Sequence, residues 1–150
     1  MKLSQEAIRD RLDRWPVARL ATTGASGRPH QVPIVFVRLG ECLWSPVDGK
    51  PKTGTELVRV RNIRERPDVS LLLDEYTDDW RRLWWIRIDA NGRVVRPQAL
   101  PADPSFLAAQ EALREKYPQY EDVPLMQGPP TMLAFDLVHI RSWCAGSNAI

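Results

Sequence analysis

LWSPVDGKPKTGTELVRVRNIRERP, residues 43–67, predicts a short strand around Trp44, then a tight loop and a helix. Thr53 is a favourable N-cap, and Glu56 three residues later completes a capping box. Apolar residues then recur at helical spacing until Pro67 ends the helix. We therefore expect a strand–loop–helix unit in this part of the chain.

This unit is rich in positive charge. A basic loop followed by a helix start suits a phosphorylated, anionic ligand, because the N–H groups and the helix dipole at that end also favour anions. The same charges also fit a solvent-exposed basic helix, and the residues alone leave both interpretations open. Arg64 lies within the apolar arc, so it must reach solvent, pair with an acid or face an anion. The cations of the unit are Lys50, Lys52, Arg59, Arg61, Arg64 and Arg66, and its acids are Asp48, Glu56 and Glu65.

Length and composition predict a single domain over residues 1–150. The formal net charge is +2, so any anion site must be local, and we expect no nucleic acid partner. Cys42 and Cys144 lack a CxxC partner, which favours a reducing compartment over a disulfide framework. No apolar run approaches the ~18 residues of a membrane span, and the charged first residues do not resemble a secretory signal. We expect a cytoplasmic protein that does not contact membranes.

Short, hairpin-linked strands dominate the rest of the predicted structure. Asn91-Gly92 between two strand-like runs predicts a β-hairpin. Pro33 inside a strand over residues 29–38 requires a sheet edge, a bulge or a break, because proline has no N–H to donate. The helices are few and do not alternate with strands, so we predict a mainly β (α+β) fold, a closed or half-closed antiparallel barrel. The expected helices lie at 4–15, 53–66 and 103–117, and the expected strands at 17–23, 29–38, around 44, 69–76, 83–88, 93–96 and 131–142.

Familiar catalytic signatures are absent from the sequence. Gly49-Lys50-Pro51 lacks the rest of a phosphate-binding loop, and His30 and His139 do not form a zinc motif. Asp78 and Asp79 are adjacent in a loop and fit a solvated turn better than a catalytic pair. We therefore expect no catalytic side chain and no metal, and we assign any chemistry to a bound cofactor.

Two aromatic features suggest binding surfaces. Trp84 and Trp85 are adjacent on one strand and point to opposite faces, so one of them needs a second apolar surface, for which a dimer interface is the natural candidate. Trp80 lies in the loop just before them. His30 begins a strand, where it either hydrogen-bonds a ligand ring or serves as an ordinary surface or core histidine.

Three runs of sequence resemble a known family: GRPHQVPIVF (27–36), WSPVDGKPK (44–52) and VRVRNIRERPDVSLLLDEYTDDWRRLWWIRI (58–88). They are similar to the pyridoxamine 5′-phosphate oxidase-like (PPOX class) split β-barrel superfamily. More closely, they resemble its actinobacterial branch, which binds the deazaflavin coenzyme F420. The resemblance extends over residues 12–96 and is loose over the C-terminal third.

The resemblance implies an antiparallel split β-barrel of the FMN-binding type, working as a homodimer with two cofactor sites at the subunit interface. Cations would hold the phosphate and the anionic oligoglutamate tail, and the loop with Trp80 and Arg81 would complete the pocket. It also implies that Pro33 interrupts its strand beside the ring. The residues implied for the ring system are His30, Val32, Pro33, Trp44, Ser45 and Val47, and those for the phosphate and tail are Lys50, Lys52, Arg59 and Arg61.

The activity implied is that of a coenzyme F420-dependent oxidoreductase, which passes a hydride from the reduced deazaflavin to a small, electron-poor organic acceptor. The sequence does not name that acceptor. Two alternatives stay open: an FMN-dependent oxidoreductase of the pyridoxamine phosphate oxidase type, and a non-catalytic carrier of the coenzyme. A binding module for nucleic acid is a further possibility, since basic residues and tryptophans on a small barrel can stack bases, although the charge is confined to one helix.

Overall fold

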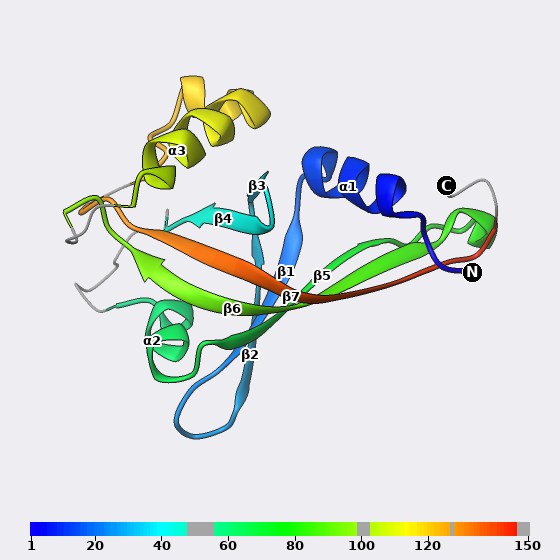
Figure 1. The fold of residues 1–150 in the computed structure, drawn as a ribbon, viewed down its shortest axis with the longest axis horizontal. Helices are drawn as coiled ribbons and strands as arrows, with labels where there is room; N and C mark the ends of the chain where they lie inside the picture. The colour runs from blue at the N-terminus through cyan, green and yellow to red at the C-terminus, as the bar shows by residue number, and fades with distance from the viewer. Residues whose placement is uncertain (48–55, 99–102, 127, 147–150) are drawn as a thin grey trace.

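The computed structural model describes residues 1–47, 56–98, 103–126 and 128–146. In these residues, seven antiparallel strands form one sheet in the order β2-β1-β5-β6-β7-β4-β3, with three α-helices around it (Figure 1). This arrangement confirms the predicted mainly β class. The elements are α1 (Gln5–Arg14), β1 (Ala18–Thr23), β2 (Pro29–Ile34), β3 (Val37–Leu39), β4 (Cys42–Pro46), α2 (Val58–Glu65), β5 (Asp68–Glu75), the 3₁₀ turn η1 (Trp80–Arg82), β6 (Trp84–Val95), α3 (Ser105–Lys116), the 3₁₀ turn η2 (Pro118–Glu121) and β7 (Met132–Cys144).

The two edges of the sheet lie near each other. β2 and β3 stand at opposite ends of the strand order, yet only Val35 and Phe36 separate them in the chain. Two intervening residues span at most ~11 Å between the flanking Cα atoms, so the sheet must curl until its edges approach. No ladder joins β2 to β3 in the described residues. The result is a curled sheet that remains split between these edges, as the resemblance implied.

The strand predicted over residues 29–38 is therefore two strands with a corner at Val35 and Phe36. Pro33 lies within β2, opposite Arg19 of β1, and β2 is an edge strand, where a missing N–H costs no ladder hydrogen bond. The edge, rather than a break at the proline itself, accommodates Pro33. The break comes two residues later.

The buried side chains form two clusters. The larger one lies inside the curled sheet and includes Leu20, Leu71 and Ile86, none of which is exposed to solvent. The smaller one lies where α3 packs near β3, around Trp44 and Leu113. Each fully buried side chain of this size contributes about 1.5–3 kcal/mol, so both clusters hold the barrel and its outer helix together.

Local signals placed the start of α1 correctly and that of α3 to within one residue, since α3 begins at Ser105 with Pro104 as its N-cap. The Ser4 hydroxyl accepts a hydrogen bond from the Ala7 N–H at 3.1 Å, which caps α1. The Asp103 carboxylate accepts one from the Ser105 N–H at 2.9 Å, at the start of α3. Both interactions depend on residues close in sequence, which explains why the sequence predicted them.

The helix of the basic unit differs from its prediction. α2 begins at Val58, after an extended residue at Leu57, and has no side-chain cap. Glu56 is not helical, and it forms an ion pair with Arg64, the arginine within the apolar arc. The predicted capping box is therefore wrong at Glu56, because this carboxylate pairs with a side chain further along the helix. Thr53 lies outside the described residues.

The predicted Asn91-Gly92 hairpin is also wrong. β6 runs without a turn from Trp84 to Val95 and pairs with β7 along that length. The Gly92 N–H donates to the Pro67 carbonyl at 2.7 Å, and a Cβ on Gly92 would come within 3.2 Å of Ile63 Cγ2. This glycine permits the close approach of α2 to the sheet and forms no turn. In the described residues four strands precede α2 and two separate it from α3, whereas the sequence predicted three and three.

Candidate functional site

Asn62 and Glu65 fix α2 to the β1–β2 hairpin. Both lie in the run 58–88 that resembles the known family. The buried Asn62 side chain donates to Thr22 Oγ1 at 3.0 Å, and the Glu65 carboxylate accepts from the Ala25 N–H at 2.8 Å. A Cβ on Gly24 would lie 2.4 Å from Asn62 Oδ1, so only glycine fits there without a shift. These contacts orient the first turn of α2, and its arginines, beside the corner of the barrel.

A cavity of about 240 Å³ lies at that corner, between β2, β4 and α2. It brings together three residues that the sequence assigned to the cofactor site: Pro33, Ser45 and Arg59. Ser45 is only 2% exposed, and Arg59 is half-buried in the first turn of α2. Arg59 and the buried Ser45 thus line one small hollow. The cavity is lined by Val17, Pro33, Ile34, Val35, Ser45, Pro46 and Arg59.

Other predicted ring contacts lie on neighbouring strands. His30 and Val32 occupy alternate positions of β2, opposite Thr22 and Leu20, and both are half-buried. The Nδ1 atom of His30 is buried and has no hydrogen-bond partner in the described part of the chain. An unpartnered buried nitrogen is costly, so a ligand group that pairs with it gains affinity. Val47 packs against the main core and donates its N–H to the Thr131 carbonyl at 3.0 Å.

Three predicted site residues lie away from the cavity. Trp44 is only 1% exposed and belongs to the smaller core cluster, with the Arg93 guanidinium 5.5 Å from its ring centroid. Trp80 is 72% exposed, and Arg81 is exposed and paired with Asp79 at 2.9 Å. This hydrogen bond lowers the pKa of Asp79, which keeps the carboxylate ionised within a solvated turn.

Trp80 and Arg81 stand at the far end of the sheet from α2. The eight residues of β5 separate the two regions, which is roughly 23 Å of strand. Figure 1 shows η1, in light green beside the chain ends, opposite α2. A single copy of the chain therefore does not bring this loop to the cavity.

The remaining predicted cations do not line the corner cavity in the described residues. Arg61 is exposed on α2, and Lys50 and Lys52 lie outside the described residues. Within the described ranges, no three His, Cys, Asp or Glu side chains gather to hold a metal ion. No helix there is long and apolar enough to cross a membrane.

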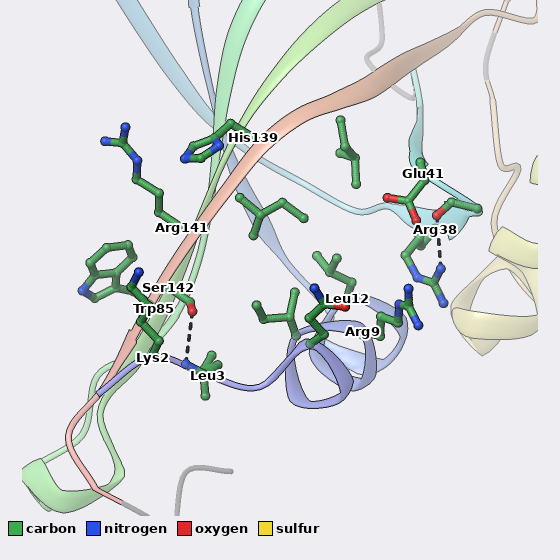
Figure 2. A pocket seen from close by; sticks show the side chains of 15 residues that line it. Lys2, Leu3, Arg9, Leu12, Arg38, Glu41, Trp85, His139, Arg141 and Ser142 are labelled. Atoms are coloured by element: carbon green, nitrogen blue, oxygen red, sulfur yellow. Dashed lines mark hydrogen bonds between the residues drawn. The ribbon is translucent and has the colours of Figure 1, made fainter.

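A larger hollow, of about 690 Å³, lies along β7 (Figure 2). We call it the β7 groove. Sequence reasoning missed it, because its residues come from four separate segments of the chain and carry no common motif. The groove is lined by Lys2, Leu3, Gln5, Ile8, Arg9, Leu12, Arg38, Gly40, Glu41, Trp85, Leu137, His139, Ile140, Arg141 and Ser142.

A model of a known protein family matches most of the chain. The model for pyridoxamine 5′-phosphate oxidase matches residues 4–144. The chain belongs to the pyridoxamine 5′-phosphate oxidase family. None of the curated protein sequences matches it at a significant level.

Solved structures that share the fold of this pyridoxamine 5′-phosphate oxidase family member have different ligands in their names. A FAD-binding protein from Mesorhizobium loti is 17% identical, with a TM-score of 0.68 and coverage of 95% of this chain and 95% of that one. A heme storage protein from Vibrio cholerae is 18% identical, with a TM-score of 0.68 and coverage of 96% and 95%. An F420 reductase is 19% identical, with a TM-score of 0.60 and coverage of 88% and 94%. At these identities the likeness shows the fold alone.

Proposed function

We propose that this protein is a coenzyme F420-dependent oxidoreductase that works on a small, electron-poor organic acceptor. The observation that carries the proposal is the corner cavity, which is lined by Arg59, the buried Ser45 and Pro33 of the edge strand. The unpartnered Nδ1 of His30 lies on that same edge strand, β2. An apolar hollow with a few convergent polar groups is the usual form of a cofactor site.

The residues present fit a deazaflavin coenzyme. His30 would hydrogen-bond the polar edge of the ring, with Val32, Pro33, Ser45 and Val47 around it. Trp44 would support the site from within the core. The cations would hold the phosphate and the oligoglutamate tail, since both are anionic and the start of α2 adds its dipole. These cations are Arg59 and Arg61, together with Lys50 and Lys52, which precede α2 in the sequence.

When bound, the reduced coenzyme supplies a hydride to the acceptor. The chain itself would orient the ring, exclude water and neutralise the tail. No protein nucleophile is needed, which agrees with the lack of a catalytic motif in the sequence. We assign no catalytic residue and no metal.

We further propose that the site is completed by a second copy of the chain. A cavity of about 240 Å³ is smaller than the ~300–1,000 Å³ of typical ligand pockets. Trp80 and Arg81 lie about one strand length away in the same copy, so a two-fold partner is the simplest source of these side chains for the ring. Trp80 is 72% exposed and Trp143 is 40% exposed, and both would gain from burial in a homodimer.

An FMN-dependent oxidoreductase is the second candidate, because the matching family model is that of pyridoxamine 5′-phosphate oxidase. A non-catalytic coenzyme carrier would use the same cavity. We place the protein in the cytoplasm, since Cys42 and Cys144 are both free thiols. We assign no nucleic acid partner, because the net charge of +2 is small.

Purification from a host that lacks the deazaflavin separates the two cofactors. We expect protein without bound FMN that binds added coenzyme F420, whereas copurified FMN would favour the second candidate. Hydride transfer to a panel of quinones, tetrapyrroles and nitro compounds then separates an enzyme from a carrier.

Substitution of the cations tests the site itself. We expect Lys52→Ala, Arg59→Ala and Arg61→Ala each to weaken coenzyme binding about 10-fold, in line with ~1.5 kcal/mol for a charge-assisted contact. Arg66→Ala, at the other end of α2, is the matched control and should bind like the parent. If all four variants bind as tightly as the parent, the anion site is misplaced.

A further inference from the structure

One edge of β7 is open along part of its length. β4 pairs with β7 only from Met132 to Asp136. Beyond that, the Leu137 N–H donates to the Glu41 carbonyl at 3.0 Å, and the Cys144 N–H donates to the Met1 carbonyl at 2.8 Å. Between these two contacts, β7 is paired with β6 on one side and faces the β7 groove on the other.

The open edge presents unpaired backbone groups. The N–H of Cys144 donates to the Met1 carbonyl, and its carbonyl accepts from the Met1 amino group. Backbone direction alternates along a strand, so Ser142 and Ile140 point their N–H and carbonyl groups to the same side, into the groove. Within the described ranges, no backbone hydrogen bond reaches Ile140 from that side. At Ser142 the edge is narrower, because the Leu3 N–H donates to the Ser142 hydroxyl at 3.2 Å and Leu3 therefore lies beside it. Such an edge is a template for another strand.

The groove has the dimensions of an extended peptide. Its volume is about 690 Å³, and the open part of β7, residues 138–141, accommodates about four residues at ~3.3 Å each. α1 forms the facing wall (Figure 2). Apolar side chains line the groove between α1 and β7: Leu3, Ile8, Leu12, Leu137 and Ile140.

The charge around the groove is mostly positive. Arg38 is engaged with Asp13 at 2.8 Å, but Lys2, Arg9 and Arg141 are exposed and form no ion pair within the described part of the chain. Glu41 is the one acid among the lining residues. Three uncompensated cations over an apolar floor favour an anionic ligand with apolar side chains.

We propose that the β7 groove binds an acidic, extended segment of another protein, which adds to the open edge of β7 as a further strand. Alternate side chains of that segment are apolar and pack between α1 and Ile140. The side chains between them are acidic and lie beside Arg141, Arg9 and Lys2. Backbone hydrogen bonds to Ile140 supply part of the affinity. This site is separate from the corner cavity and does not depend on the coenzyme.

Two methylated peptides test the strand addition directly. The probe is a capped, fluorescein-labelled hexapeptide of alternating Val and Glu, measured by fluorescence polarisation against the full chain. One derivative is N-methylated at odd positions and the other at even positions. In an added strand only one of these sets of N–H groups faces β7, so one derivative should lose at least 10-fold in affinity and the other should keep it. Equal affinities for the two derivatives, or no binding of the parent peptide up to ~1 mM (about 4 kcal/mol of binding), would overturn the proposal.

Protein variants test the charge. Arg141→Glu should weaken binding of the Val–Glu peptide at least 10-fold. A peptide of alternating Val and Lys should instead bind this variant more tightly than it binds the parent protein. Arg87→Glu is the matched control, because Arg87 lies directly opposite Arg141 on β6 but does not line the groove. If both variants lose affinity equally, general charge attraction explains the binding and the groove does not.

Hydrogen exchange distinguishes a peptide from a second copy of the chain. The amide of Ile140 should exchange fast in the free protein at every concentration and become protected when the peptide binds. Protection that appears with rising protein concentration, without peptide, would show that another copy covers the edge, and the proposal would be wrong.

Discussion

The corner between β2 and β3 depends on one hydroxyl, that of Tyr117 at the end of α3. It accepts from the Phe36 N–H at 3.0 Å, and it lies 2.9 Å from the Pro16 carbonyl and 3.0 Å from the Phe36 carbonyl. With a single proton, it donates to one of these carbonyls at a time. Phe36 is fully buried, and Tyr117 is 7% exposed. We predict that Tyr117→Phe destabilises the protein strongly, although it removes one atom.

The magnitude follows from these contacts. The variant leaves the Phe36 N–H buried without a partner, which costs about 1–3 kcal/mol, and it loses one donated hydrogen bond worth about 1 kcal/mol. The free energy of unfolding should therefore fall by about 2–4 kcal/mol. For a chain of 150 residues, each 1 kcal/mol lowers Tm by about 2–4 °C, so Tm should fall by roughly 4–16 °C.

Urea denaturation followed by tryptophan fluorescence measures this change. Tyr76→Phe is the matched control, because Tyr76 is 78% exposed, and its unfolding free energy should stay within about 0.5 kcal/mol of the parent. Hydrogen exchange at the Phe36 amide should accelerate in Tyr117→Phe alone. If Tyr117→Phe is as stable as Tyr76→Phe, then these hydrogen bonds do not hold the corner of the barrel.

Three further changes test other parts of the structure. Gly24→Ala should cost about 2–4 kcal/mol in urea denaturation, because the new Cβ would lie 2.4 Å from Asn62 Oδ1, and Asn62→Ala should recover part of that loss. Burial lowers the pKa of Lys116 to about 8, from 10.5. The unfolded chain therefore binds more protons between these values, so stability should rise from pH 8 to 10.5, and this slope should be smaller in Lys116→Met. Burial and Asp136 raise the pKa of Cys42 to about 11, so its alkylation by iodoacetamide at pH 8 should be slow in the folded protein and fast in urea. Equal alkylation rates in the two conditions would contradict this assignment.

The sequence predicted those parts of the fold that depend on near neighbours. Ser4 and Asp103 mark the starts of α1 and α3, because a cap needs only the next two or three residues. Pro33 required an edge, a bulge or a break for a similar local reason, since the residue cannot donate to a ladder, and the structure has it on an edge strand. The alternation of apolar residues and the scarcity of helices sufficed for a mainly β class.

Long-range contacts overruled other local signals. Asn91-Gly92 has the composition of a turn, yet Gly92 lies where α2 meets β6, and the space beside Ile63 requires the glycine. Glu56 has the spacing of a capping box, yet it pairs with Arg64. In the first case the contact arises from the packing of two elements. In the second case the partner lies further along the sequence than a capping box extends. No short sequence pattern reveals either contact.

For the candidate site, the sequence by itself determined which residue types are available: a basic helix, a histidine, a proline within a strand and a serine. The tertiary structure decided which of them meet. It brought Pro33, Ser45 and Arg59 to one cavity, buried Trp44 in the core and left Trp80 about one strand length away. It also created the β7 groove from four separate segments. The physical reason is that side-chain direction and sheet curl depend on the packing of the whole chain. The spacing of residues along the sequence specifies neither of them.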